Sequence, residues 1–369
     1  MNRRSASKRA RPTTGLTQLG ITLGFGCCFA LLTEFAVVAS QEPKESKSSL
    51  DRNLLSEKIS STIRTINEEK SPAVVRIRSN DGRGEIVGTG FYIDPTGTIC
   101  TLAEIVEGGR NITIEQEGRT LPATLLAVDP RSGIAFLKAT EENAATNFLP
   151  AVPGTNSPAL TPVIGIGYPR EQQTTPVLGM ITGSKNHEGS FYYCVTHMVA
   201  SMPLTEGEGG TPVLDLSGNL LGIVTSGNTQ MGLCTILPSA AIEQLHHNLL
   251  RFGNLNPGWV GAVVEFAAVP QKESRTRVSS IDPGSPAETA GLQPGDTLLM
   301  LGNRTVHTPE DVLEASFYLT AGEPIEITIW RGGSTRKLTL VCKEKPETGD
   351  DLATNASAEP TASLGAFGH

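Results

Sequence analysis

The sequence predicts a mainly β protein with two small barrels, followed by a compact α+β module. Glycine (39) and proline (24) are abundant among the 369 residues, which is typical of many short connections. From residue 71 to about 237, short β-branched runs alternate with Gly, Pro and Asp turns, as they do in barrels and sandwiches. Residues 257–345 instead combine two well-marked helix starts with five strand-like runs. The change of pattern near residue 257 indicates a domain boundary.

Composition and charge exclude several classes of protein. Hydrophobic residues make up 38% and charged residues 18%, so the chain can bury cores and is not disordered overall. The formal net charge of −8 argues against a general nucleic-acid binder. Six cysteines in this length do not make a disulfide-dense scaffold.

The N-terminal 40 residues have the pattern of an export signal. Five basic residues precede the apolar run 21–33, and small residues at 37–40 offer a cleavage site. The alternative is an uncleaved anchor formed by residues 21–39, which Glu34 interrupts. Both interpretations place residues 41 onward in the periplasm or another extracytoplasmic space, where disulfides can form.

The rest of the chain divides into four predicted parts. Residues 41–70 comprise a polar linker and a helix, with apolar residues at helical spacing from Leu54 to Ile66. Residues 71–252 hold the barrels and end in a helix over 239–252. Residues 257–345 form the α+β module. The tail 346–369, rich in Ala, Thr, Ser and Gly, is predicted to be disordered.

Two helices of the α+β module are marked by capping residues. Ser285 is an N-cap, Pro286 occupies the first helical position, Glu288 completes a capping box, and Gly291 ends the helix. Thr308 begins a second helix by the same logic. Five strands are expected around these helices: Gly261–Phe266, Arg277–Ile281, Thr297–Leu301, Ile325–Trp330 and Lys337–Val341.

Four segments of the barrel region resemble the HtrA/Deg (DegP-like) family of PDZ-containing serine proteases. They are residues 88–97 (GTGFYIDPTG), 101–108 (TLAEIVEG), 129–138 (DPRSGIAFLK) and 207–215 (GEGGTPVLD). They occur in the family's order, and the resemblance covers about residues 55–345. It implies a chymotrypsin/trypsin-like double β-barrel followed by one PDZ domain.

All three positions that match the family's catalytic triad are substituted. Glu104 stands at the position of the histidine base, Gly133 at that of the aspartate, and Gly209 at that of the serine nucleophile. Gly209 offers no hydroxyl to attack a carbonyl, and Gly133 has no carboxylate to orient a base. Removing one triad member costs on the order of 10⁴–10⁶ in turnover. The sequence therefore predicts a catalytically degenerate member, a pseudoprotease.

An oxyanion hole is formed by backbone N–H groups, so substitution of the triad side chains does not by itself remove it. By resemblance, the backbone N–H groups of Gly207 and Gly209 would form it. The Glu208 carboxylate would oppose a developing negative charge unless it faces solvent. Glu104 and Glu208 could also form a metal or acid–base pair, but no Asp, Glu or His cluster has ligand spacing. We expect two solvated glutamates, no metal and no cofactor.

Relocated catalysis would need another serine–histidine pair. His187 and His197 fall in the second barrel region, and Ser201 and Ser226 lie near the lost nucleophile in sequence. Such a pair must approach to about 2.6–3.2 Å. The simpler expectation is that these residues are structural or exposed.

Four cysteines follow the predicted signal. The resemblance places the strands that carry Cys194 and Cys234 close together, which implies a disulfide between them. The alternative is that these two, with Cys100 and Cys342, are free buried thiols.

The surviving functional site is expected in the C-terminal module. Residues 283–296 (PGSPAETAGLQPGD) closely resemble bacterial-type PDZ domains. Trp259, Val260, Gly261 and Ala262 occupy the family's carboxylate-binding loop, whose N–H groups hold a peptide C-terminus. The peptide then adds as a strand, and the helix after Thr308 forms the other wall. The alternative is a PDZ domain that only packs on a neighbour or mediates assembly.

The sequence leaves three alternative functions. The first is an exported, proteolytically inactive binding or regulatory protein that captures protein C-termini or unfolded polypeptides, active HtrA relatives among them. The second is an active serine endopeptidase of envelope protein quality control with displaced catalytic residues. The third is a structural assembly protein. The resemblance also implies a homo-oligomer, a trimer, and no nucleic-acid partner.

Overall fold

A computed structural model describes residues 47–116, 118–140, 147–153, 157–170, 172–185, 195–267 and 274–344. The predicted signal or anchor (1–40) and the predicted tail (346–369) lie outside the described residues. The described residues from 53 onward belong to one unit, which contains all described strands. No helix of the described segments is long and apolar enough to cross a membrane.

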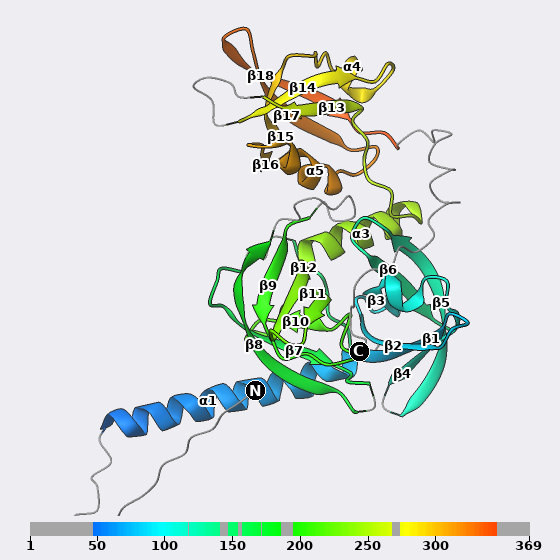
Figure 1. The fold of residues 1–369 in the computed structure, drawn as a ribbon, viewed down its shortest axis with the longest axis vertical. Coiled ribbons are helices and arrows are strands. Elements are labelled where there is room, and N and C mark those ends of the chain that lie inside the picture. The colour runs from blue at the N-terminus through cyan, green and yellow to red at the C-terminus, as the bar shows by residue number, and fades with distance from the viewer. Residues whose placement is uncertain are drawn as a thin grey trace, which may run out of the picture. The chain divides into compact units, whose positions relative to one another are not determined.

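The first barrel closes six antiparallel strands in the order β1-β2-β3-β6-β5-β4 (Figure 1). β1, β3 and β6 are almost wholly buried, because many of their side chains belong to a core that also contains residues of the second barrel and of the helix after it. A short helix, α2 (Ala103–Val106), follows β3 directly. The strands are β1 (Val74–Asn80), β2 (Glu85–Tyr92), β3 (Thr98–Leu102), β4 (Arg110–Gln116), β5 (Arg119–Asp129) and β6 (Ile134–Ala139).

The second barrel repeats this closure in the order β10-β11-β12-β9-β8-β7. The connection then enters α3 (Ser239–Phe252), which ends at Gly253 in the left-handed conformation. The strands are β7 (Pro162–Gly167), β8 (Thr175–Lys185), β9 (His197–Ser201), β10 (Pro212–Leu214), β11 (Leu220–Asn228) and β12 (Leu233–Pro238).

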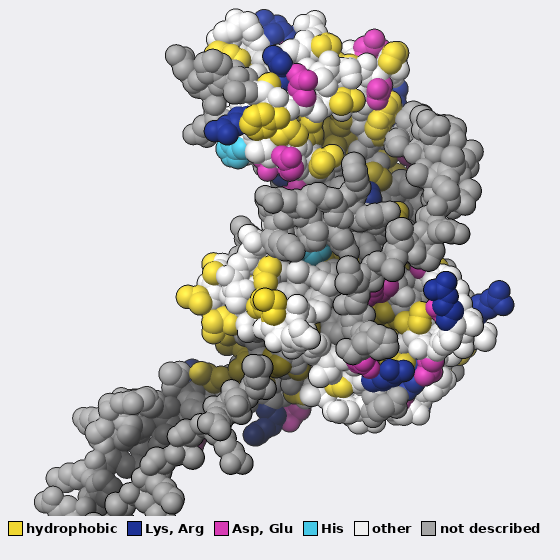
Figure 2. All heavy atoms as spheres, in the orientation of Figure 1, with side chains coloured by type: hydrophobic (Ala, Val, Ile, Leu, Met, Phe, Trp, Pro, Cys, Tyr) yellow, Lys and Arg dark blue, Asp and Glu magenta, His cyan; other side chains and the backbone are white. Residues whose placement is uncertain are grey.

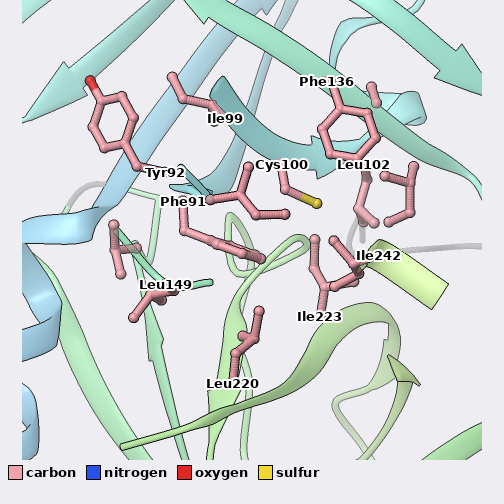
Figure 3. Packing of buried hydrophobic residues seen from close by; sticks show 14 of the residues in the cluster. Phe91, Tyr92, Ile99, Cys100, Leu102, Phe136, Leu149, Leu220, Ile223 and Ile242 are labelled. Carbon is pink, nitrogen blue, oxygen red and sulfur yellow. The ribbon is translucent and has the colours of Figure 1, made fainter. Parts of the chain in front are cut away.

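One hydrophobic core lies where the two barrels and α3 meet. Figure 3 shows aromatic and aliphatic side chains of β2, β3 and β6 packed against Leu220 and Ile223 of β11 and Ile242 of α3. Phe91 and Phe136 are fully buried in it. Side chains from both barrels therefore hold their facing walls together, and the cleft described below lies between these walls.

The helix before the barrels is longer than the apolar spacing predicts. α1 runs from Lys47 to Lys70 and leads into a 3-10 turn, η1 (Ser71–Ala73). Ile63 and Ile66 pack on the barrel core, whereas Leu54 and Ile59 are exposed. The polar residues from 47 onward were expected to belong to a linker. They contain no Gly or Pro, so nothing in them ends the helix.

The C-terminal sheet has the order β13-β14-β15-β17-β18, with β16 paired to β15 (Figure 1). The five predicted strands and two helices all form. The Ser285 hydroxyl accepts from the Glu288 N–H as an N-cap, but the Glu288 carboxylate accepts from the Gly284 N–H and does not complete the predicted capping box. Thr308 with Asp311 makes a capping box. The elements are β13 (Ala262–Phe266), β14 (Thr276–Ile281), α4 (Pro286–Thr289), β15 (Thr297–Leu301), β16 (Arg304–Thr305), α5 (Pro309–Phe317), β17 (Pro324–Arg331) and β18 (Ser334–Val341).

These elements confirm the predicted mainly β class with two six-stranded barrels and a C-terminal α+β domain. On the face shown in Figure 2, basic and acidic side chains are interspersed, and hydrophobic side chains also reach the surface over β8. Leu178 and Met180 of β8 are among the exposed large hydrophobic residues.

Candidate functional site

A cleft of about 270 Å³ lies between the two barrels. Its walls come from the first half of β2, from α2, and from the two loops that precede β8 and β10. The cleft brings together two of the triad-equivalent positions, Glu104 and Gly209, and the predicted oxyanion residue Gly207. Its lining consists of Glu85, Ile86, Val87, Glu104, Ile105, Arg170, Glu206, Gly207 and Gly209.

The third triad-equivalent position is held beside this cleft. The carbonyl of Gly133 accepts a 2.7 Å hydrogen bond from the N–H of Ala103, the residue before Glu104. Gly133 itself has φ +70°, a left-handed conformation. The structure therefore brings these three residues near one another, and Glu104 carries the one polar side chain among them.

Thr89 of β2 holds the loop that carries both glycines, a role that the sequence reading missed. Its N–H donates to the Gly209 carbonyl (2.8 Å), and its hydroxyl donates to the Gly207 carbonyl (2.9 Å). The same hydroxyl accepts from the N–H of Tyr168 (3.0 Å). A Cβ on Gly210 would lie 2.1 Å from the Thr89 carbonyl oxygen, so this close approach requires glycine.

The two predicted oxyanion N–H groups remain available. Among the described residues, no acceptor is found for the N–H of Gly207 or Gly209, and both residues line the cleft. Two such donors can bind a carbonyl or carboxylate oxygen. Their positions are set by contacts with Thr89 and do not depend on the side chains at positions 104 and 133.

The sequence analysis predicted that Glu208 is solvated, and this prediction is wrong. Its side chain is only 1% exposed, and one carboxylate oxygen, Oε2, accepts from the N–H (2.5 Å) and the hydroxyl (2.8 Å) of Thr205. Burial raises the pKa of this carboxyl. Glu208 turns away from the cleft lining, so it neither forms a pair with Glu104 nor contacts a ligand there.

Glu104 keeps solvent access in the cleft, and the neighbouring walls still remove part of its hydration. This desolvation raises the pKa of the Glu104 carboxyl. On the facing side, Arg170 pairs with Glu206 (3.2 Å), and the Arg170 N–H donates to the Glu206 carbonyl (2.9 Å). These two contacts join the loop before β8 to the loop before β10.

The described residues give no support to a relocated serine–histidine pair. The Ser226 hydroxyl contacts that of Thr235 (2.5 Å), and His197 Nδ1 contacts the Val195 carbonyl (2.8 Å). Ser201 is exposed on β9, and His187 lies outside the described residues. Within the described segments, no group of three His, Cys, Asp or Glu side chains could hold a metal ion.

The implied Cys194–Cys234 disulfide stays a prediction, because only one of its two cysteines is described. Cys234 is a free thiol buried in the core of the second barrel, where it packs among apolar side chains and is directed away from solvent. Cys194 lies outside the described residues. Cys100 and Cys342 are also free and buried, which agrees with the alternative interpretation for these three cysteines.

The predicted carboxylate-binding loop precedes β13. Trp259 is tied to Lys343 by two backbone hydrogen bonds, and the carbonyls of Val260 and Gly261 accept from Ala287 and Asp282. Among the described residues, no acceptor is found for the N–H groups of Val260 and Gly261.

Two features fit this loop and the following strand for a peptide. Gly261 has φ +76°, and a Cβ there would lie 2.3 Å from the Ser285 Cβ, so only glycine allows this loop path. Among the described strands, β13 pairs only with β14 and thus has an open edge, and α5 contacts β13. Three apolar residues of these elements, Val263, Phe266 and Leu313, are more than half exposed.

Comparisons with known proteins match both the barrel region and the C-terminal domain. The trypsin-like peptidase domain family matches residues 88–223, and the PDZ domain family matches residues 277–331. A serine protease of Synechocystis sp. named HhoB is 28% identical over 283 residues, covering 70% of this chain and 67% of the relative. A DegP-like periplasmic serine endoprotease of Ectopseudomonas mendocina is 27% identical, covering 74% of this chain and 60% of the relative.

Solved structures share the fold. The HtrA-type protease AlgW with a tripeptide has a TM-score of 0.62 at 22% identity, covering 78% of this chain and 98% of that one. A serine endoprotease from Yersinia pestis has a TM-score of 0.54 at 21% identity, covering 77% and 98%. This chain spans between about half and two thirds of the curated relatives it matches. With two closed barrels, a C-terminal PDZ domain and these relatives, the chain belongs to the HtrA/DegP family.

Proposed function

We propose that this protein is a non-proteolytic member of its family that binds peptide C-termini through its PDZ domain. The residues of the cleft between the barrels support the first claim, that the protein is not a protease. The cleft holds Glu104 and Gly209 where a base and a nucleophile would be needed, and the Gly133 position beside it has no carboxylate. A glycine has no atom that can form an acyl-enzyme, so this cleft has no nucleophile at that position.

The binding half rests on the loop before β13. The free N–H groups of Val260 and Gly261 can hold a terminal carboxylate, and the open edge of β13 can pair with the residues that precede it. Val263, Phe266 and Leu313 add apolar contact area near this edge. The partners would be C-termini of proteins or of unfolded polypeptides. The periplasmic relatives and the basic, apolar N-terminus support an extracytoplasmic site of action.

Proteolysis of casein tests the first half. We expect no cleavage by the natural chain and no labelling by a fluorophosphonate probe. The variant Glu104→His/Gly133→Asp/Gly209→Ser supplies all three side chains, with residual strain because Gly133 has a positive φ. Cleavage by the natural chain that is lost in Ser201→Ala or Ser226→Ala would instead establish a relocated active site.

Peptide binding tests the second half. A fluorescent peptide with an apolar C-terminal residue should bind, and the same peptide with an amidated C-terminus should bind at least about tenfold more weakly. Gly261→Ala should abolish this difference, because the new Cβ displaces the loop from Ser285. Gly332→Ala is the matched control, since Gly332 also has positive φ (+57°) but open space at its Cβ position. Equal binding of free and amidated peptides by the natural chain would refute terminal-carboxylate recognition.

A further inference from the structure

Glu208 is buried in the loop before β10, and only one of its two carboxyl oxygens is hydrogen-bonded. Oε2 accepts from Thr205, whereas Oε1 has no hydrogen-bond partner among the described residues. The hydroxyl of Thr211, which is fully buried, likewise has no partner in the described part of the chain. An unpaired polar atom in the interior costs free energy, so these two atoms mark a site that is only partly satisfied.

The two unpaired atoms lie against the same piece of backbone, that of Gly167 in β7. A Cβ built on Gly167 would lie 2.3 Å from Thr211 Oγ1 and 3.3 Å from Glu208 Oε1. Glycine at position 167 therefore makes room for these two side chains. The Glu208 carboxyl is thus enclosed by residues of the second barrel, with Oε1 near a hydroxyl that can either donate or accept.

No cation compensates a negative charge on Glu208. Among the described residues, no salt bridge reaches it, and the two nearest arginines are engaged elsewhere. Arg170, in the neighbouring loop before β8, pairs with Glu206 (3.2 Å), and Arg76 of β1 pairs with Glu115 (2.8 Å). A buried carboxylate without a cation is less stable than the neutral acid.

The other titratable groups on the elements around this loop are acidic. Glu104 of α2 and Glu85 of β2 line the cleft across from it, and Asp215 follows β10. Tyr168, after β7, is a buried phenol. β11, which accepts the N–H of Gly210 in the same loop, has no charged residue. A negative charge on Glu208 would therefore meet further carboxylates and no compensating cation in the described part of the chain.

We propose that the loop of residues 205–210 is a pH-sensitive element, in which the Glu208 side chain stays inside while it is protonated and leaves when it ionises. Thr89 holds the carbonyls of Gly207 and Gly209, on either side of Glu208. Withdrawal of the Glu208 side chain therefore pulls on both glycines, which line the cleft. Their N–H groups keep their positions at acidic pH and lose them as the pH rises. This behaviour depends on neither peptide binding nor proteolysis.

Proton linkage gives the direction of the effect. Burial raises the pKa of the Glu208 carboxyl above its ordinary value of 4.5. The folded chain therefore keeps this proton over a range of pH in which the unfolded chain has released it. The resulting stabilisation is fully present below about pH 4.5 and is lost as the pH rises through the folded-state pKa. Glutamine at this position cannot ionise, so it retains the stabilisation at every pH.

Glu208→Gln tests this behaviour, because glutamine has the shape of the protonated acid, with an NH2 group in place of the O–H. Urea denaturation of the full chain measures the unfolding equilibrium constants of both proteins at about pH 5 and about pH 8. We expect the constant of the natural chain, divided by that of Glu208→Gln, to rise at least about fivefold between these pH values. In Glu107→Gln, which removes an exposed carboxylate after α2, the same ratio should change less than about twofold.

Hydrogen exchange locates the effect in the loop. The natural chain and Glu208→Gln are compared by mass spectrometry at the same pH, so that the intrinsic exchange rates cancel. At about pH 8 the peptide that spans residues 205–211 should exchange at least about threefold faster in the natural chain, and at about pH 5 equally fast. Peptides from β1 should not differ at either pH, which excludes global unfolding as the cause.

Three results overturn the proposal. The first is a ratio of unfolding constants that is the same at both pH values, because Glu208 would then bind its proton no better in the folded chain. The second is a destabilisation by Glu208→Gln that grows with pH, because the carboxylate would then be the stabilising form. The third is equal exchange of residues 205–211 in the two proteins at about pH 8.

Discussion

The hydroxyl of Thr89 donates to the carbonyl of Gly207 over 2.9 Å, and this bond joins the two barrels at the floor of the cleft. Thr89 belongs to β2 of the first barrel, and Gly207 lies in the loop before β10 of the second. Through this bond a side chain of one barrel sets the path of the backbone that carries the cleft's N–H donors. The place of these donors therefore depends on Thr89 and not on a side chain at position 209, which is glycine.

Thr89→Val tests this connection, since valine keeps the shape of threonine and removes its hydroxyl. The Gly207 carbonyl and the Tyr168 N–H would each lose a buried hydrogen-bond partner. We expect the free energy of unfolding to fall by about 2–3 kcal/mol, measured by urea denaturation. Thr182→Val, which removes an exposed hydroxyl from β8, should cost less than about 1 kcal/mol. Equal losses in the two variants would contradict the role given to Thr89.

The Asp94 carboxylate is expected to make part of the free energy of unfolding depend on pH. Burial opposes ionisation of Asp94, but hydrogen bonds from Thr96, Thr98 and His246 outweigh it and lower the pKa to about 2. Because the folded-state pKa lies below the unfolded value, this contribution is present above about pH 4 and is lost as the pH falls toward 2. It amounts to on the order of 2 kcal/mol.

Asp94→Asn should therefore lower the free energy of unfolding at pH 7, and the difference from the natural chain should shrink between pH 4 and pH 2. Urea denaturation over this pH range measures it. Asp282→Asn is the control, because Asp282 is exposed. A difference for Asp94→Asn that stays constant down to pH 2 would contradict this account of the Asp94 carboxylate.

The buried Cys234 thiol is expected to be alkylated slowly in the native protein. Burial raises the pKa of its thiol to about 12, and the thiolate is the reactive form. We expect alkylation by iodoacetamide, followed by mass spectrometry, to be at least about a hundredfold slower in buffer than in denaturant. Cys234 should react fully in denaturant without reductant. Protection that only a reductant removes would show that Cys234 forms a disulfide after all.

Much of the fold could be predicted from local sequence signals. The capping residues Ser285 and Thr308 begin the two C-terminal helices because their side chains satisfy the first free N–H groups, a requirement that is local in the chain. The absence of a nucleophile at Gly209 is equally a property of the sequence. By contrast, the burial of Glu208 could not be read locally, because Gly167 of β7, which is distant in the sequence, packs close to its side chain.

The sequence by itself determined the order of the domains, the residues at the three positions that match the family's triad, and the glycines that allow tight backbone approaches. Only the tertiary structure decided which of these features share a site. Thr89 and Gly207 are 118 residues apart, and Asp94 and His246 are 152 apart, so their hydrogen bonds exist only once both barrels have closed and packed. The open edge of β13 among the described strands is likewise a matter of strand pairing, which local propensity does not specify.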